Sequence, residues 1–282
     1  MVHVYVVSAF SKNGGGGNLA GVVLDRPDLT AAQKMAAAGA LGYSETAFVT
    51  GSDRADFRLA YFTPTEEVPL CGHATIASFT LLHRLGRLPR REFWMETKAG
   101  VLRMAVSEDG AVRMEQNCPV YGQVLAIRDL AGCAEVSAVH PEFPIQVVST
   151  GLRDIMLPMA SREALAGMRP DREAMKALSR AHDVTGVHAF ALAEEGEVTA
   201  FCRNFAPLVG IDEESATGTS SCALACYLAA HGVRRERYVF EQGYELGAPS
   251  RITVDLRYDG DRIDGVFVGG AGYLVCEKDL DL

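Results

Sequence analysis

The segment at residues 204–232 constrains the fold more than any other part of the chain. A polar loop with three acidic residues leads into a Thr-Gly-Thr turn at residues 217–219, and no Asp, Glu, Lys or Arg lies between Gly218 and Gly232. A helix without a polar face is buried in a protein core or in a membrane, and about 20 apolar residues are needed to span a bilayer. This run is shorter. We therefore predict a core helix that ends at Gly232.

The same pattern occurs earlier in the chain. Residues 72–86 also run from glycine to glycine over 15 residues, and Arg84 is their one permanent charge. The residues upstream match as well: Glu67 with Glu213, Phe62-Thr-Pro64 with Phe205-Ala-Pro207, and Phe48 with Phe190. An ordered set of spacings that occurs twice indicates an internal repeat. We predict an α+β protein of two pseudo-symmetric halves, each a curved mixed β-sheet or barrel around one central buried helix.

Composition limits the class of protein and its partners. The chain has 282 residues, of which 48% are hydrophobic and 22% charged, and this is typical of a globular protein large enough for two domains. A net charge of −9 argues against a nucleic-acid partner. The seven cysteines are scattered, and the first residues lack the pattern of a secretory signal. We expect a cytoplasmic protein with no nucleic-acid or membrane partner.

Glycine and proline mark the remaining elements. Four glycines at residues 14–17 suggest a phosphate-binding loop, but no Lys-Ser/Thr follows and the next segment has the pattern of a strand, so we predict a turn. A helix is expected from Thr30 through Ala38, ended by Gly39. Residues 117–122 break the strand pattern and are the expected crossover between the halves.

The two predicted core helices offer paired sites for an anion. The first backbone N–H groups of a helix have no partner within it, and the helix dipole adds about half a positive charge at that end. If the halves face each other, Gly72 and His73 of one helix and Gly218 and Thr219 of the other point into one cleft. A small anionic metabolite, such as a carboxylate, suits this arrangement.

Several motifs, taken in order, give a more specific indication. They are Gly17-Asn18-Leu-Ala-Gly-Val-Val23, Ser44-Glu45-Thr-Ala-Phe48, Phe62-Thr-Pro64, Leu70-Cys-Gly-His-Ala-Thr75, Ser149-Thr-Gly-Leu152, Arg203-Asn-Phe-Ala-Pro207, Glu213-Glu-Ser-Ala-Thr-Gly-Thr219 and Phe240-Glu-Gln-Gly243. With them the chain resembles the PhzF-like isomerases of phenazine biosynthesis, over nearly its whole length. That family shares the fold of diaminopimelate epimerase and proline racemase.

The resemblance implies a domain division, an assembly and an active site. It implies an N-terminal half of residues 1–117 and 270–282, a C-terminal half of residues 118–269, an active-site cleft between them, and a homodimer. Glu45 matches the family's acid/base glutamate and His73 its active-site histidine. Asn18, Gly72 and Gly218 fall in the motifs expected to bind substrate.

The chain also departs from the family pattern. Glu214 stands where many members have aspartate, Ser215 replaces a proline, and Thr219 replaces the serine that closes the motif. Leu19 replaces a further proline. These changes leave the chemistry possible but put the identity of the substrate in doubt.

Cys71 leaves a second mechanism open. In the racemases of this fold, a cysteine in each half shares the removal and return of a proton, but here the two positions hold Cys71 and Thr217. A two-thiol racemase is therefore not expected, and Cys71 is interpreted as a small buried residue. Cys71 and His73 supply only two metal donors, so no metal is expected, and the resemblance implies that no other cofactor is needed.

Three hypotheses follow from these residues. The first is a cofactor-independent isomerase in which Glu45 moves a proton while His73, Glu214 and Thr219 orient the polar groups of the substrate. The second is an epimerase or dehydratase that uses Cys71 as its base. The third is a non-catalytic protein that binds a small molecule in the same fold. Fold alone does not name the substrate, because one fold hosts several chemistries.

Overall fold

The computed structural model of the chain describes residues 1–130 and 132–281. Two compact units are present. The first contains Met1–Glu115 and the C-terminal segment that starts at Gly269, and the second is Gln116–Val268. The boundaries expected from sequence, at residues 117–118 and 269–270, lie one or two residues away from these positions.

The first unit is built on a mixed sheet. Its strands are β1 (Val2–Ala9), β2 (Asn18–Leu24), β3 (Thr46–Thr50), β4 (Phe57–Phe62), β5 (Glu67–Val68), β6 (Glu92–Thr97), β7 (Gly100–Val106), β8 (Val112–Gln116) and β18 (Gly272–Leu280). β1 pairs antiparallel with both β18 and β2, and β2 pairs parallel with β3. β3 pairs antiparallel with β4, which pairs parallel with β6 and antiparallel with the short β5. β6, β7 and β8 complete the sheet as antiparallel neighbours.

The second unit repeats this plan. Its strands are β9 (Val120–Leu125), β10 (Ile145–Ser149), β11 (Arg153–Pro158), β12 (Gly186–Leu192), β13 (Ala200–Ala206), β14 (Ile211–Glu214), β15 (Arg237–Gln242), β16 (Ser250–Asp259) and β17 (Arg262–Gly270). β10 and β11 are antiparallel, β11 and β12 parallel, and β12 and β13 antiparallel. β13 pairs parallel with β15 and antiparallel with the short β14. β15 and β16 are antiparallel.

The order of parallel and antiparallel pairs is therefore the same from β1 to β7 as from β10 to β16. The repeated phenylalanines occupy matching places in it, since Phe48 pairs with Ala60 between β3 and β4, and Phe190 pairs with Cys202 between β12 and β13. The prediction of two pseudo-symmetric α+β halves, made from the spacing of a few residues, is confirmed.

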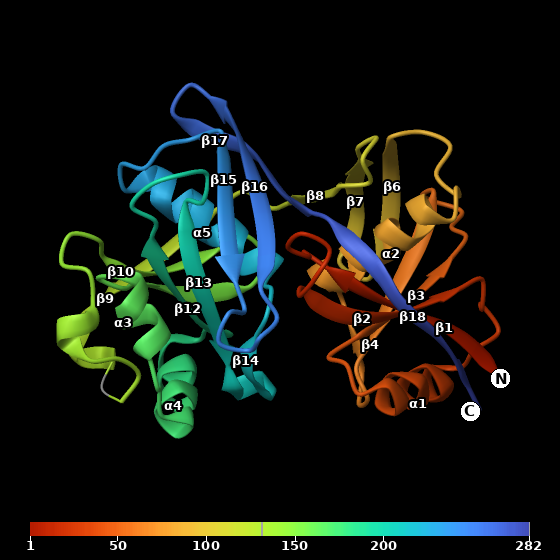
Figure 1. The fold of residues 1–282 in the computed structure, drawn as a ribbon, viewed down its shortest axis with the longest axis horizontal. Helices are drawn as coiled ribbons and strands as arrows, with labels where there is room; N and C mark the ends of the chain where they lie inside the picture. Colours follow the sequence, from red (N-terminus) through yellow and green to blue (C-terminus); the bar gives the residue numbers. More distant parts are fainter. Residues whose placement is uncertain (131, 282) are drawn as a thin grey trace. The chain divides into compact units, whose positions relative to one another are not determined.

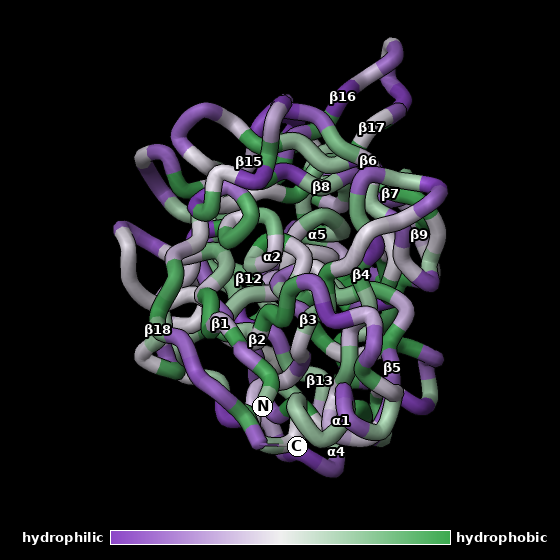
Figure 2. Tube along the Cα trace, turned by 90° about the vertical axis from the view of Figure 1, so that its right-hand side faces the viewer, coloured by the Kyte–Doolittle hydropathy of each residue, from purple (hydrophilic) through white to green (hydrophobic). Residues whose placement is uncertain are grey.

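Each unit folds around one apolar helix, as Figure 1 shows for α2 (Gly72–Arg84) and α5 (Gly218–Ala230). The ten residues from His73 to Leu82 of α2 are all buried, and so is almost every residue of α5 from Gly218 to Leu228. In Figure 2 the tube is largely green to white at both helices, and purple gathers in loops such as the one between β16 and β17. The prediction of two core helices is confirmed.

Further helices cover the outer faces of the sheets. α1 (Ala31–Leu41) packs with Val4, Val23 and Phe48 in the first unit. In the second unit, α3 (Arg162–Gly167) and α4 (Arg172–His182) pack on β11 and β12. The strands that these helices cover, such as β3, β11 and β12, are buried along most of their length and show little alternation, whereas β6, β8 and β16 alternate between buried and more exposed residues. Short 3-10 helices lie at Ile127–Leu130, Val136–Ala138 and Pro207–Val209.

Some local predictions were wrong. Gly39 does not end α1, because the helix continues to the buried Leu41, and Gly42 ends it in a left-handed conformation with φ 71°. The expected crossover at residues 117–122 directly follows the boundary between the units at Glu115 and Gln116, and only its last three residues belong to a strand, β9, which pairs with β10. The polar loop before Gly218 contains the short strand β14. Across residues 1–130 and 132–281, no helix combines the length and the apolar character that a membrane span requires.

Candidate active site

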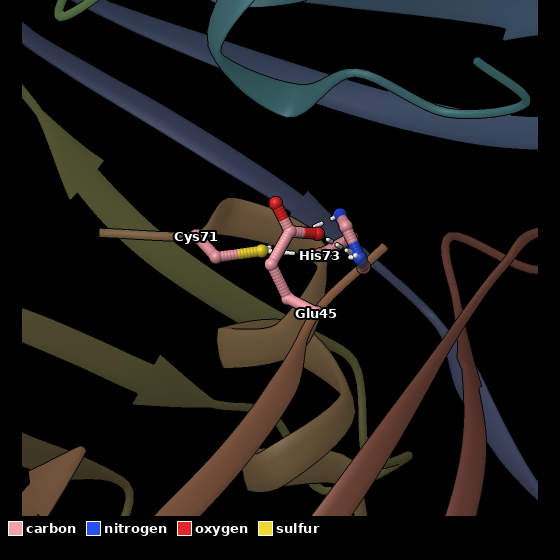
Figure 3. Close-up of side chains that lie close together, drawn as sticks. All are labelled: Glu45, Cys71 and His73. Atoms are coloured by element: carbon pink, nitrogen blue, oxygen red, sulfur yellow. Dashed lines mark hydrogen bonds and ion pairs between the residues drawn. The ribbon is translucent and has the colours of Figure 1, made fainter. Parts of the chain in front are cut away.

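Three of the predicted site residues meet at one end of α2. Glu45 immediately precedes β3, Cys71 is the N-cap of α2, and His73 lies in its first turn. His73 Nε2 is 3.3 Å from Glu45 Oε2, and Cys71 Sγ is 3.5 Å from His73 Nδ1 and 3.8 Å from Nε2. Figure 3 shows the three side chains converging on one point. The fold has brought together residues that lie 26 positions apart in sequence.

A hydrogen-bonded chain from the sheet fixes this end of α2. The Thr75 hydroxyl donates to the carbonyl oxygen of Cys71 at 2.7 Å, and Tyr61 Oη lies 2.5 Å from Thr75 Oγ1. Because the one hydroxyl proton of Thr75 goes to Cys71, the Tyr61 hydroxyl is the donor in the second bond. Tyr61 belongs to β4 and is fully buried, so the sheet core holds the backbone that presents Cys71 and His73.

Glu45 is largely buried and lacks a full set of hydrogen bonds. Its side chain is only 17% exposed, and its buried Oε2 has no hydrogen-bond partner among the described residues. Burial raises the pKa of Glu45, and a hydrogen bond from Cys71 opposes that shift. A carboxyl group whose pKa moves toward neutrality can both take and give a proton at physiological pH.

Asn18 lies at the same edge of the sheet as Glu45. It is the first residue of β2, which runs parallel to β3 with Gly21 opposite Thr46. Asn18 itself is buried. The glycine before it cannot be replaced, because Gly17 has φ 82° and an added Cβ would lie 2.4 Å from the carbonyl oxygen of Ala9. As predicted, the glycine run forms a turn, and it is followed by the strand β2 and not by the helix of a phosphate-binding loop.

The other predicted residues lie in the second unit, around the start of α5. Glu214 ends β14, and its Oε2 accepts a hydrogen bond from Thr217 Oγ1 at 3.0 Å. Gln242 Nε2 donates to the carbonyl oxygen of Glu214 at 2.6 Å and to Thr217 Oγ1 at 3.1 Å. Gly218 is the first residue of α5 and is buried. This network fixes the loop that carries Glu214.

Residues of the turn between β10 and β11 contact Thr219. Thr150 Oγ1 donates to the carbonyl oxygen of Thr219 at 3.1 Å, and an added Cβ on Gly151 would lie 3.3 Å from Thr219 Cγ2. The motif at residues 149–152 therefore supports the first turn of α5. Sequence reasoning quoted this motif and the one that contains Gln242 but assigned neither of them a role.

Arg203, in β13, holds β14 in place through Glu213. Its guanidinium forms two 2.8 Å hydrogen bonds to the Glu213 carboxylate, and it also donates to the carbonyl oxygens of Leu165 and Met168. Both side chains of the pair are largely buried. The Arg203 motif is thus explained by the need to hold the strand that leads to Glu214.

The arrangement around Glu45 is suited to proton transfer. Cys71 is buried, but its sulfur contacts His73. Its hydrogen bond also acts on the Glu45 carboxyl. One donor atom from each of Glu45, Cys71 and His73 lies within 4.8 Å of the others. Proton transfer by Glu45 and by Cys71 are both compatible with this geometry.

Comparison with known sequences assigns the chain to a family. The sequence profile of the phenazine biosynthesis-like proteins, PhzC-PhzF, matches residues 7–278. The chain belongs to this family. A Deinococcus radiodurans protein named an uncharacterized isomerase is 37% identical over 279 residues, which cover 94% of this chain and 90% of that protein. The trans-2,3-dihydro-3-hydroxyanthranilate isomerase of Pseudomonas chlororaphis is 29% identical over 279 residues, or 96% of each protein. The chain is therefore an isomerase of the PhzF family.

Known structures give the same assignment. The crystal structure of a PhzF-family phenazine biosynthesis protein from Bacillus anthracis matches with a TM-score of 0.92 at 28% sequence identity, over 100% of this chain and 99% of that one. The resemblance inferred from the motifs is confirmed, together with the fold class.

Proposed function

We propose that the chain is a cofactor-independent isomerase in which Glu45 takes a proton from a carbon atom of a small carboxylate and returns it at another carbon. The observation that carries this proposal is the buried, hydrogen-bond-poor Glu45 carboxyl beside His73 at the first turn of α2. The family assignment supports isomerase chemistry, and the position of Glu45 in Ser-Glu-Thr-Ala-Phe matches the acid/base residue that the resemblance implies.

The proposed reaction balances without a redox partner. The Glu45 carboxylate removes a proton from a carbon next to a carbonyl or a double bond, and the electron pair left on that carbon shifts the double bond. The protonated Glu45 then delivers its proton to a second carbon, so the product has the same atoms as the substrate. Burial, which raises the pKa of Glu45, makes the carboxylate a stronger base than one in water.

His73 and the helix terminus suit a negatively charged substrate. His73 Nε2 is 3.3 Å from Glu45, close enough to orient the carboxylate and to hydrogen-bond a substrate atom held there. Cys71, the N-cap of α2, makes no side-chain cap hydrogen bond, and the N-terminal end of a helix attracts a negative charge. A carboxylate group satisfies both features. The α5 turn at Gly218 and Thr219, with Glu214, is proposed to bind substrate as well, since α5 also lacks a side-chain cap.

A substrate to test first is suggested by a relative. The Pseudomonas chlororaphis protein is named for trans-2,3-dihydro-3-hydroxyanthranilate, which is a small unsaturated carboxylate. Glu214 and Ser215 depart from the motif expected of the family. We therefore propose the reaction class for this chain and regard that compound as the first member of a panel of small unsaturated carboxylates.

A second candidate mechanism is favoured by one contact. Cys71 Sγ lies 3.5 Å from His73 Nδ1, so the histidine could assist a thiol base. In that case the chain would act as an epimerase or dehydratase through Cys71. A non-catalytic binding protein is the third alternative, and it predicts ligand binding without turnover.

Isomerisation in D2O tests the proposed reaction class. The Glu45 side chain is 17% exposed, so the proton that it has removed can exchange with D2O while the intermediate is bound. The product is then expected to carry deuterium at the carbon that is protonated, detected by NMR or mass spectrometry. A panel of carboxylates that bind without isomerisation or deuterium uptake would support the binding-protein alternative. Loss of all deuterium uptake after alkylation of Cys71, with ligand still bound, would favour the thiol mechanism instead.

A further inference from the structure

The site around Glu45 contains three different kinds of metal donor. A carboxylate oxygen, a thiol sulfur and an imidazole nitrogen, from Glu45, Cys71 and His73, lie within 4.8 Å of one another. The sequence offered only the Cys-x-His pair, and two donors are too few for a protein metal site. The fold adds the third donor from the start of β3 (Figure 3).

Two of the three distances between these donors are close to those of a tetrahedral zinc centre, and the third, from Cys71 Sγ to a Glu45 carboxylate oxygen, is within 4.8 Å. With Zn–N and Zn–O bonds of about 2.0–2.2 Å and a Zn–S bond of about 2.3 Å, tetrahedral geometry separates N and O by roughly 3.3–3.5 Å and S and N by roughly 3.5–3.6 Å. His73 Nε2 is 3.3 Å from Glu45 Oε2 and 3.8 Å from Cys71 Sγ. The pairs that share Nε2 are therefore within a few tenths of an ångström of the separations that zinc requires.

The state of Glu45 Oε2 points to the same ligand. This oxygen is buried and accepts no hydrogen bond from residues 1–130 or 132–281. A buried carboxylate oxygen is normally hydrogen-bonded or bound to a metal, because it has lost its water. A cation bound by both Oε2 and the imidazole nitrogen would satisfy it. The hydrogen bonds of Tyr61 and Thr75 already hold the backbone of Cys71, one of the three donor residues.

We propose that Glu45, Cys71 and His73 bind one thiophilic divalent cation, of which Zn²⁺ is the type, with the fourth position open to water or to a carboxylate ligand. Thiolate and imidazole donors select zinc-like ions over Mg²⁺ and Ca²⁺, which prefer sites built only from oxygen. Cys71 binds as the thiolate and releases its proton to solvent. If the proposed function holds, the ion occupies the base and inhibits the isomerase reversibly.

Cobalt provides a direct probe of the site, because Co²⁺ bound to a thiolate in tetrahedral geometry has a charge-transfer band and intense visible bands. Titration of the full chain, kept reduced and free of chelators, is expected to give these bands at one equivalent, and Zn²⁺ should remove them. Cys71→Ser is expected to abolish the thiolate band and to weaken Zn²⁺ binding at least tenfold. Cys118→Ser is the matched control, since Cys118 is an exposed thiol beside Asp261 and Asp264 in a pocket of the second unit. It should keep both the band and the affinity.

A second measurement avoids any folding defect of the variants. In the wild-type chain, one equivalent of Zn²⁺ should slow the alkylation of Cys71 by iodoacetamide at least tenfold, measured by peptide mass spectrometry, and EDTA should restore the rate. Neither readout uses turnover, so the metal site and the proposed function can fail separately. The metal site is refuted if Co²⁺ binds without a thiolate band, if Cys71→Ser keeps that band, or if Zn²⁺ leaves the alkylation of Cys71 unchanged.

Discussion

The hydrogen-bonded chain that fixes the start of α2 gives a prediction with a definite sign. Tyr61 donates to Thr75, and Thr75 donates to the carbonyl oxygen of Cys71, all in the buried core of the first unit. Tyr61→Phe removes one buried hydrogen bond and leaves Thr75 bonded to Cys71. A hydrogen bond of this kind contributes about 1 kcal/mol to the free energy of unfolding. We expect a loss of that size.

Thr75→Val has a larger effect although it keeps the shape of the side chain. It removes both hydrogen bonds and leaves the Tyr61 hydroxyl buried with only Met95 Sδ, a weak acceptor 3.8 Å away. Orphaning a buried donor costs about 1–3 kcal/mol, so the total loss is roughly 2–4 kcal/mol. In the double variant Tyr61→Phe/Thr75→Val the orphaned donor is gone. We therefore expect it to be more stable than Thr75→Val by about 1 kcal/mol or more.

The assay is equilibrium unfolding in urea followed by tryptophan fluorescence. Trp94 is the one tryptophan of the chain and lies in β6 of the first unit, so its signal reports on that unit. Ser78→Ala is a matched control, because the Ser78 hydroxyl is buried in the same helix but bonds only to the carbonyl oxygen of Ala74. It should cost less than Thr75→Val. A double variant as unstable as the sum of the two single variants would refute the assigned direction of these hydrogen bonds.

Three further predictions concern pH, an ion pair and a turn. Burial raises the pKa of Glu45 in the folded chain, so the free energy of unfolding falls as the pH rises from about 4.3 through the folded pKa. Urea unfolding at several pH values should therefore show Glu45→Gln gaining stability relative to the wild type across that pH window. A difference that stays constant with pH would contradict the raised pKa. Arg203→Ala leaves the buried Glu213 carboxylate without its bidentate partner, so the free energy of unfolding should fall by about 3–5 kcal/mol. A loss below about 1 kcal/mol would mean that the ion pair is solvated. Gly243→Ala should lower Tm far more than Gly247→Ala. Both glycines have a positive φ, but only at Gly243 would an added Cβ lie 2.4 Å from a carbonyl oxygen. Equal shifts in Tm would contradict the close packing around Gly243.

The architecture could be predicted because the sequence contains an internal repeat. A helix with almost no charged residues is expected to be buried, and the matched spacings before Gly72 and Gly218 predicted the same strand order in both halves. The structure has that order. Elements of two to four residues, such as β5 and β14, were not predicted, because so few residues carry no periodic pattern. The end of α1 was misplaced because a glycine inside a helix and a glycine that ends one look alike in sequence.

The candidate site could be predicted only in part. Motif positions identified Glu45 and His73, but no spacing along the chain shows that Glu45 lies against Cys71. The supporting hydrogen bonds of Tyr61 and Gln242 join residues 14 and 28 positions apart in sequence. Contacts of this kind depend on strand register and on side-chain rotamers, which the sequence does not display.

The most direct test of the account is the rate of isomerisation by Glu45→Gln compared with Cys71→Ala, measured with trans-2,3-dihydro-3-hydroxyanthranilate or another carboxylate that the wild type converts. Glutamine keeps the shape of the side chain but cannot take a proton from carbon. Glu45→Gln should therefore still bind ligand and lose roughly two to four powers of ten in kcat, the usual contribution of a positioned acid–base group. Cys71→Ala should lose much less. An inactive Cys71→Ala beside a Glu45→Gln that turns over at the wild-type rate would contradict the assignment of Glu45 and place the chemistry on the thiol.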